Sequence, residues 1–298
     1  MKHEVEFSQP KEPQGPNKLI HQAGRDIGRL FVDRLGVLEQ DEINDLVADT
    51  RFHHFPGEAI LLGFQNALSL HPDHPYVLDY FPQERNDLLP GRIALVAHGV
   101  MASLLAGGHH DVVTDKVYID PYPTLIYYTL TNFARNEIKL EDFVISTALY
   151  MMLINPFTVP YAIYHEMIHG ISARGKRTES RRFNETLTDF FARQVIRDAH
   201  HKLGRLARLS ARIGKLLLNP FERKAIDYIM LRMIAARPDE PSMPLRELAA
   251  VYTGVSNGSF AALFDSYTNG QGQHVLETID EKVPENEKLA KLEALFDS

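Results

Sequence analysis

The segment His165-Glu166-Met167-Ile168-His169 constrains this chain more than any other part of its sequence. On an α-helix, residues four apart share one face with Cβ atoms about 5–6 Å apart, so both imidazoles can reach one metal ion. Glu166 is rotated by about 100° from His165, which places its carboxylate beside the ion, where it can take a proton from an activated water. The pattern therefore predicts a helix that presents half of a zinc site.

The residues around this segment favour a helix over 159–174. Thr158 is a candidate N-cap, Pro160 suits the first turn, and Gly175 is a candidate stop. The apolar neighbours that predict burial of this helix are Ala162, Ile163, Met167 and Ile168. Taken alone, the five-residue pattern also fits two hydrogen-bonded core histidines.

A second apolar-patterned helix, which opens with Asn184-Glu185-Thr186-Leu187-Thr188-Asp189, offers what the first one lacks. A catalytic zinc ion takes three protein ligands and leaves a fourth position to water, so Glu185 is the candidate third ligand. A ligating imidazole also needs a partner, commonly a carboxylate, on its other ring nitrogen. Asp189 shares a face with Glu185 and fits that need.

Together these residues resemble the thermolysin-like, glutamate-zincin metallopeptidases, whose pattern is H-E-x-x-H followed by a helix carrying N-E-x-x-x-D. The resemblance implies a zincin-like fold and one zinc ion per chain, held by His165, His169 and Glu185. It also implies zinc-dependent hydrolysis of peptide bonds, with Glu166 as the general base. Asp189 would be the carboxylate that orients a zinc-ligating histidine.

The resembled group stabilises the oxyanion with a tyrosine or histidine from outside the two motifs. The candidates here are His274, Tyr228, Tyr252 and Tyr267, and no spacing rule selects one of them. The Gly-x-Met-Glu-Asn type of signature, which anchors a substrate amino terminus in related aminopeptidases, does not occur, and this slightly favours an endopeptidase over an exopeptidase. Two alternatives stay open: a non-catalytic regulatory or interaction protein that keeps the zinc as a structural clip, and hydrolysis of a non-peptide amide.

The remaining histidine groups carry less weight. His53-His54, His71-x-x-His74 and His109-His110 sit beside Pro, Gly or Asp. We predict solvated loop residues at these positions, because neighbouring residues on a loop or strand do not converge on one ion.

Composition limits the class of protein. The chain has 298 residues and 44% hydrophobic residues, enough for a packed core in one large domain or two small ones. A formal net charge of -7 argues against a nucleic-acid binder. There is no cysteine, which excludes disulfides and thiolate metal sites. Residues 1–6 are polar and unlike a signal peptide, so we expect a cytoplasmic protein. The resemblance implies a peptide or protein substrate, and the sequence does not predict an oligomeric state.

One uncharged run, from Phe143 to Tyr164, is long enough to span a bilayer. Asn155-Pro156 interrupts it, so we expect no membrane span. Residues 1–18 are rich in Pro, Gln, Glu and Lys and predict a disordered tail. Residues 19–298 are expected to form a single zincin-like metallopeptidase domain, which can be lobed around a cleft.

Apolar spacing predicts a mainly α fold with a small β element. The predicted helices before the metal motif are Leu19–Leu35, Asp41–Thr50, Glu58–Leu70, Ile93–Ala106, Leu125–Asn136 and Leu140–Ile154. After the two site helices, Asn219-Pro220-Phe221-Glu222 is a capping signature that opens a helix to about Ala236. The best strand candidates, which flank Thr114-Asp115-Lys116, are Val112, Val113, Val117, Tyr118 and Ile119. They form a hairpin or an edge strand, and an exposed edge beside the site could hold an extended peptide.

Overall fold

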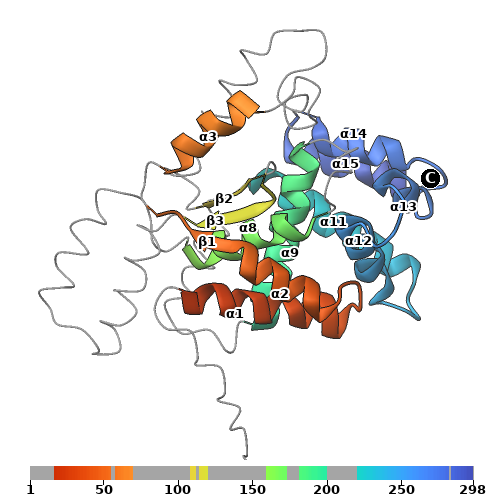
Figure 1. Cartoon of the computed structure of the whole chain (residues 1–298). Coiled ribbons are helices and arrows are strands. Elements are labelled where there is room, and N and C mark those ends of the chain that lie inside the picture. Colours follow the sequence, from red (N-terminus) through yellow and green to blue (C-terminus); the bar gives the residue numbers. More distant parts are fainter. Residues whose placement is uncertain are drawn as a thin grey trace, which may run out of the picture.

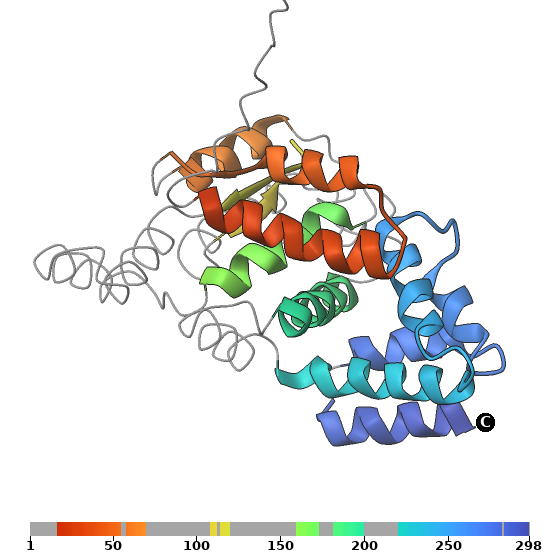
Figure 2. The ribbon, with the colours of Figure 1, turned by 90° about the horizontal axis from the view of Figure 1, so that it is seen from below.

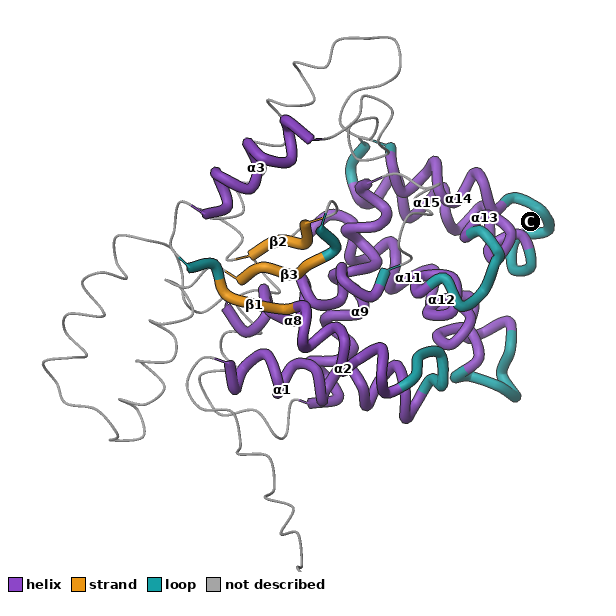
Figure 3. The backbone as a smooth tube through the Cα atoms, in the orientation of Figure 1, coloured by secondary structure: helices purple, strands orange, loops and turns teal. Residues whose placement is uncertain are grey.

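The computed structural model describes residues 17–54, 58–69, 108–111, 114–119, 159–172, 181–199, 220–281 and 283–297. Within these residues the fold is mainly helical with a small three-stranded sheet (Figure 1, Figure 3), which confirms the predicted class. The helices are α1 (Asn17–Gly28), the π-helical segment η1 (Arg29–Arg34), α2 (Gln40–Asp49), α3 (Glu58–Ser69), α8 (Val159–Ile171), α9 (Arg181–Ala199), α11 (Pro220–Ala236), α12 (Met243–Thr253), α13 (Phe260–Asp265), α14 (Gly272–Asp280) and α15 (Glu285–Asp297). The strands are β1 (Thr50–Phe52), β2 (Gly108–Asp111) and β3 (Lys116–Ile119).

The helices predicted near the N-terminus are confirmed to within a few residues. The predicted segment Leu19–Leu35 corresponds to α1 followed by η1. It stops before Gly36, whose φ of 59° is a left-handed conformation that glycine adopts without strain. Because α1 begins at Asn17, the predicted tail is too long by Asn17 and Lys18, and residues 1–16 lie outside the described part.

Three further predicted helices fall outside the described residues, and four helices that the structure contains were not predicted. The predicted helices at 93–106, 125–136 and 140–154 cannot be compared, because residues 70–107 and 120–158 are not described. The C-terminal helices α12 to α15 were not predicted. Of the helices that are described, none combines the length and the apolar character needed to cross a bilayer.

The sheet has the order β1-β3-β2, with β1 parallel and β2 antiparallel to β3. The predicted hairpin around residues 114–116 is present, but Val112 and Val113 are not described and β1 was not predicted. The prediction of His109 and His110 as loop residues was wrong, because both lie in β2. His109 pairs with Tyr118 across the antiparallel ladder, and their stacked rings are 5.5 Å apart.

His53 was also predicted as a solvated loop residue, and this was wrong too. It is only 3% exposed. Its ring stacks on Tyr118 at 4.8 Å and on His109 at 5.2 Å, and such aromatic contacts make burial of an imidazole favourable. His54 is exposed as predicted, and His71-x-x-His74 lies outside the described residues.

Helix α8 lies at the centre of the described fold. The sheet contacts one side of α8 and α9 contacts the other, and Figure 2 shows α9 between α8 and α11. A Cβ added at Gly170 of α8 would lie 2.7 Å from Leu46 Cδ1 and 3.0 Å from Val117 Cγ2, so this glycine lets α8 approach α2 and β3 closely. One cluster of buried apolar residues extends from Ile20 to Leu292 through both site helices. The site helices are therefore held rigidly on several sides.

Candidate metal centre

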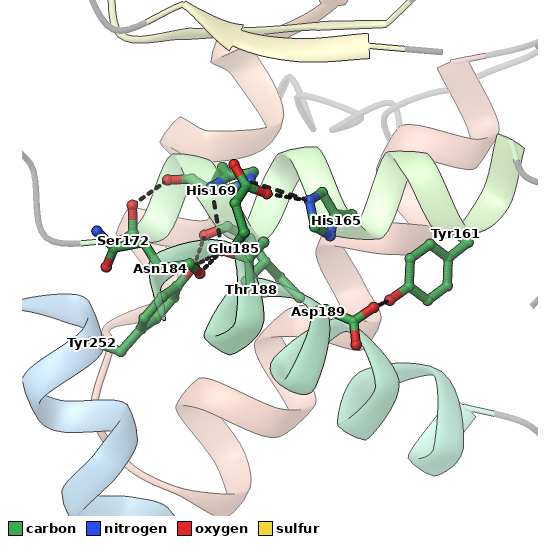
Figure 4. Close-up of polar contacts among 10 residues, drawn as sticks. Tyr161, His165, His169, Ser172, Asn184, Glu185, Thr188, Asp189 and Tyr252 are labelled. Carbon is green, nitrogen blue, oxygen red and sulfur yellow. Dashed lines mark hydrogen bonds and ion pairs between the residues drawn. The ribbon is translucent and has the colours of Figure 1, made fainter. Parts of the chain in front are cut away.

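The two motif helices bring three ligand atoms to one point. Figure 4 shows His165 and His169 on α8 and Glu185 on α9 pointing toward one another. The two Nε2 atoms are 3.2 Å apart, and Glu185 Oε2 lies 3.3 Å from His165 Nε2 and 3.2 Å from His169 Nε2. Among the described residues, these three side chains are the group that can hold a metal ion.

This triangle has the dimensions of a zinc site. In a tetrahedral site with zinc–ligand bonds of about 2.0–2.1 Å, two ligand atoms are about 3.3–3.4 Å apart. A point about 2.0 Å from all three atoms therefore exists without moving a side chain. The side chains of His165 and His169 are 13% and 14% exposed, while that of Glu185 is 31% exposed. The site thus opens toward solvent beside Glu185, as a catalytic position with one exchangeable ligand requires.

The electrostatics favour the metal-binding protonation state at two of the three ligands, His169 and Glu185. Burial lowers the pKa of His169 to about 4, so this imidazole is neutral at pH 7. Burial alone would raise the pKa of Glu185, but the positive charge that His169 carries below its own pKa and the hydrogen bond with His165 hold the pKa of Glu185 well below its usual range. Burial alone would lower the pKa of His165, but the hydrogen bond with Glu185 and the charge of Glu166 raise it. The surroundings of His165 therefore favour its protonated form, which competes with metal binding.

Glu166 follows the ligand His165 on α8, and its side chain is directed at the sheet. It is 7% exposed. A Cβ added at Gly108 would lie 3.2 Å from Glu166 Cγ, and the Glu166 carboxylate accepts a hydrogen bond from the His110 backbone N–H. Burial, together with the nearby charge of Glu185, raises the pKa of Glu166 to about 8, against the lowering effects of His165 and the His110 N–H. A base with a pKa near neutrality suits proton transfer at physiological pH.

Asp189 does not make the hydrogen bond predicted for it. Its carboxylate accepts hydrogen bonds from the Tyr161 hydroxyl, from Arg193 Nε at 3.0 Å and from Arg223 Nε at 3.3 Å. Among the described residues, His165 Nδ1 is buried without a hydrogen-bond partner. Asp189 acts on His165 through its charge, which raises the pKa of the imidazole. The guanidinium groups of Arg193 and Arg223 are not part of the sequence motif. They donate to the Asp189 carboxylate, which was predicted to accept from a histidine.

His169 is supported by Thr188, which was not predicted as a site residue, and by Tyr252, which was predicted only as an oxyanion candidate. The Thr188 hydroxyl is 3.2 Å from His169 Nδ1, and the Tyr252 hydroxyl on α12 is 2.7 Å from the Thr188 hydroxyl. The end of α8 contributes as well, because the Ser172 hydroxyl donates to the His169 carbonyl at 2.7 Å. This cap ends α8 at Ile171, earlier than the predicted Arg174.

The structure describes the surroundings of all four oxyanion candidates. Tyr252 lies on the Nδ1 side of the His169 ring, away from the atom that faces the other ligands. Tyr267 donates to Glu247 at 2.7 Å, Tyr228 packs edge-to-face on Phe296, and His274 is exposed on α14. The sequence alone cannot distinguish a tyrosine that supports a metal ligand from a tyrosine that faces the substrate.

Comparisons with known proteins add no family, since no family model, no curated protein and no solved structure matches this chain. The zinc-site hypothesis therefore depends on the geometry of His165, His169 and Glu185.

Zinc binding at pH 7 is expected to release up to about one proton per ion from Glu166. In the metal-free protein Glu166 has a pKa of about 8, so its carboxyl group is mostly protonated at pH 7, and a nearby dication expels that proton. Affinity should therefore rise with pH and level off above about 8. Calorimetric titration in buffers of different ionisation enthalpy measures the release, and Glu166→Gln should reduce it by up to about one proton. A binding heat independent of the buffer would contradict this assignment.

Proposed function

We propose that this chain is a zinc-dependent metallopeptidase. The observation that supports this most is the near-equilateral triangle of His165 Nε2, His169 Nε2 and Glu185 Oε2, with a buried carboxylate, Glu166, beside it. The order and spacing of these residues add the resemblance to the glutamate-zincins, and the proposed fold around the site is zincin-like. We favour an endopeptidase over an exopeptidase.

In this proposal, His165, His169 and Glu185 hold the zinc ion. When bound, the ion supplies Lewis acidity, which polarises the scissile carbonyl and acidifies the attacking water. Glu166 accepts the proton of that water and passes it to the leaving amine, a general acid–base role worth about 10²–10⁴-fold. The His110 N–H fixes the orientation of the Glu166 carboxylate from the sheet side.

The edge of the sheet supports an extended peptide as the substrate. In the described sheet β2 is an edge strand, and the hydrogen bond from the His110 N–H to Glu166 runs away from β3. Because backbone groups alternate along an antiparallel strand, those of Gly108 also face the free edge. A peptide that adds to this edge would pass beside Glu166, which is where the scissile bond has to lie.

Hydrolysis of a broad peptide library tests the proposal. The zinc-loaded protein should cleave internal bonds, the chelator-stripped protein should not, and stoichiometric zinc should restore cleavage. Cleavage that survives complete metal removal would overturn the proposal. One zinc per chain without cleavage of any peptide would instead support the non-catalytic zinc-binding alternative. Activity confined to non-peptide amides would support the other alternative, an amide hydrolase.

A further inference from the structure

Behind His169 lies a chain of hydroxyl groups that joins the candidate zinc site to the C-terminal helices (Figure 4). Thr188 Oγ1 is 3.2 Å from His169 Nδ1 and 2.7 Å from the Tyr252 hydroxyl, and it donates to the Asn184 carbonyl at 2.9 Å. Thr188 and Tyr252 are 0% and 2% exposed. The Tyr252 ring packs on Phe191 of α9 with centroids 4.9 Å apart, so both hydroxyls have fixed positions.

The protons in this network can be placed one by one. A threonine hydroxyl has one proton and two lone pairs. The proton of Thr188 points at the Asn184 carbonyl, so both of its lone pairs have to accept. The Tyr252 hydroxyl lies 2.7 Å from Thr188 Oγ1 and 3.3 Å from the Ile168 carbonyl, so we place its proton on the shorter contact, with Tyr252 as the donor to Thr188. His169 Nδ1–H is then the donor across the 3.2 Å contact.

In a neutral imidazole with the proton on Nδ1, Nε2 has a lone pair, which can accept from His165 Nε2–H across the 3.2 Å contact between the two rings. A hydrogen bond from His169 Nε2 to Glu185 Oε2, also 3.2 Å away, would need the opposite tautomer, with the proton on Nε2.

We propose that Thr188 and Tyr252 are positioning residues that hold His169 in the Nδ1–H tautomer, with its Nε2 lone pair directed at the zinc position. This inference rests on the proposed zinc site and adds the group that selects the ligating nitrogen. Metal-ligating histidines usually donate their other N–H to a carboxylate, a carbonyl or water. Here a threonine takes that place, and a tyrosine of α12, far along the chain, orients the threonine.

The tautomer can be read directly in the metal-free protein. Selective ¹⁵N-histidine labelling and long-range ¹H–¹⁵N correlation spectra at pH 7 distinguish Nδ1–H from Nε2–H, with His169→Gln to assign the signal. The wild type should show the Nδ1–H form. Thr188→Val removes the acceptor at nearly constant volume and should shift the population toward Nε2–H, whereas Thr188→Ser, which keeps the hydroxyl, should retain the wild-type pattern. A wild-type His169 in the Nε2–H form would overturn the proposal.

Zinc affinity, measured by competition with a chromophoric chelator, provides the second readout. Thr188→Val should weaken binding by about 10–100-fold, and Thr188→Ser should restore it to within a few-fold of the wild type. Tyr252→Phe keeps the packing on Phe191 and should give a smaller loss. Because the two hydroxyls act in series, the double variant Thr188→Val/Tyr252→Phe should bind no more weakly than Thr188→Val alone.

Thr278→Val is the matched control, because Thr278 is a buried threonine that donates to the carbonyl of His274, four residues earlier, on α14. It should leave zinc affinity unchanged, and circular dichroism should show that every variant is folded. Equal losses for Thr188→Val and Thr188→Ser, or no loss for either, would overturn the positioning role. A wild type that binds no zinc would refute the proposed function, while the tautomer measurement would still decide the role of Thr188.

Discussion

Glu166→Gln is expected to lower peptide turnover by about 10²–10⁴-fold while zinc content stays at one ion per chain. The substitution preserves size and helix, and its amide oxygen can still accept the hydrogen bond from the His110 N–H that orients the native carboxylate. An amide cannot take up the proton that the attacking water loses, so the chemical step fails while the fold and substrate binding persist. Turnover of the best library peptide and elemental analysis of the same sample measure the two quantities.

Glu293→Gln is the matched control for this variant, because Glu293 is an exposed glutamate on α15. It should cleave like the wild type. Undiminished cleavage by Glu166→Gln would remove Glu166 from the mechanism. If neither the wild type nor the variant cleaved any peptide and both carried full zinc, the structural-clip alternative would replace the peptidase.

The central part of the site could be predicted because it depends on local periodicity. His165 and His169 are one helical turn apart, so any helix through them places both imidazoles on one face. No residue distant in the sequence is needed to place the two imidazoles on the same face. Glu185 lies on a second helix, and the structure brings its carboxylate to the two imidazoles.

The partners of the ligands could not be predicted in the same way, because they depend on tertiary packing. Asp189 keeps the predicted spacing, yet Arg193 on its own helix and Arg223 on α11 compete for its oxygens. Tyr252 joins Thr188 through the packing of α12 against the site helices. The contact between α12 and α9 joins residues far apart in the sequence, so the spacing of apolar residues cannot predict it.

Signals for some missed elements were nevertheless present. Helix α12 carries buried Leu245, Leu248, Ala249 and Tyr252 at helical spacing and ends at Gly254, whose φ is 78°. Ser259 caps α13 by accepting from the Ala262 N–H at 3.1 Å. The β2 histidines are different, because Gly and Asp beside them indicate a turn and only pairing with β3 makes them a strand.

The double variant His165→Ala/His169→Ala is expected to reduce zinc content from one ion per chain to none. It removes two of the three protein ligands, so the loss should exceed the roughly 10–100-fold expected when only an orienting partner is removed. Alanine favours the helical conformation of α8, and circular dichroism checks that the fold persists. Elemental analysis after gel filtration measures the bound metal.

His54→Ala/His274→Ala is the matched control, since it removes two exposed histidines and should keep the zinc stoichiometric. Glu185→Ala provides an independent test from α9, and it should also lose zinc, because the two histidines alone leave half of a tetrahedral site to water. Asp189→Asn should act more gently, since Asp189 influences His165 through its charge and not as a ligand. Stoichiometric zinc in the His165→Ala/His169→Ala protein would show that the ion binds elsewhere. Equal and total loss in Glu185→Ala and Asp189→Asn would make Asp189 itself a ligand.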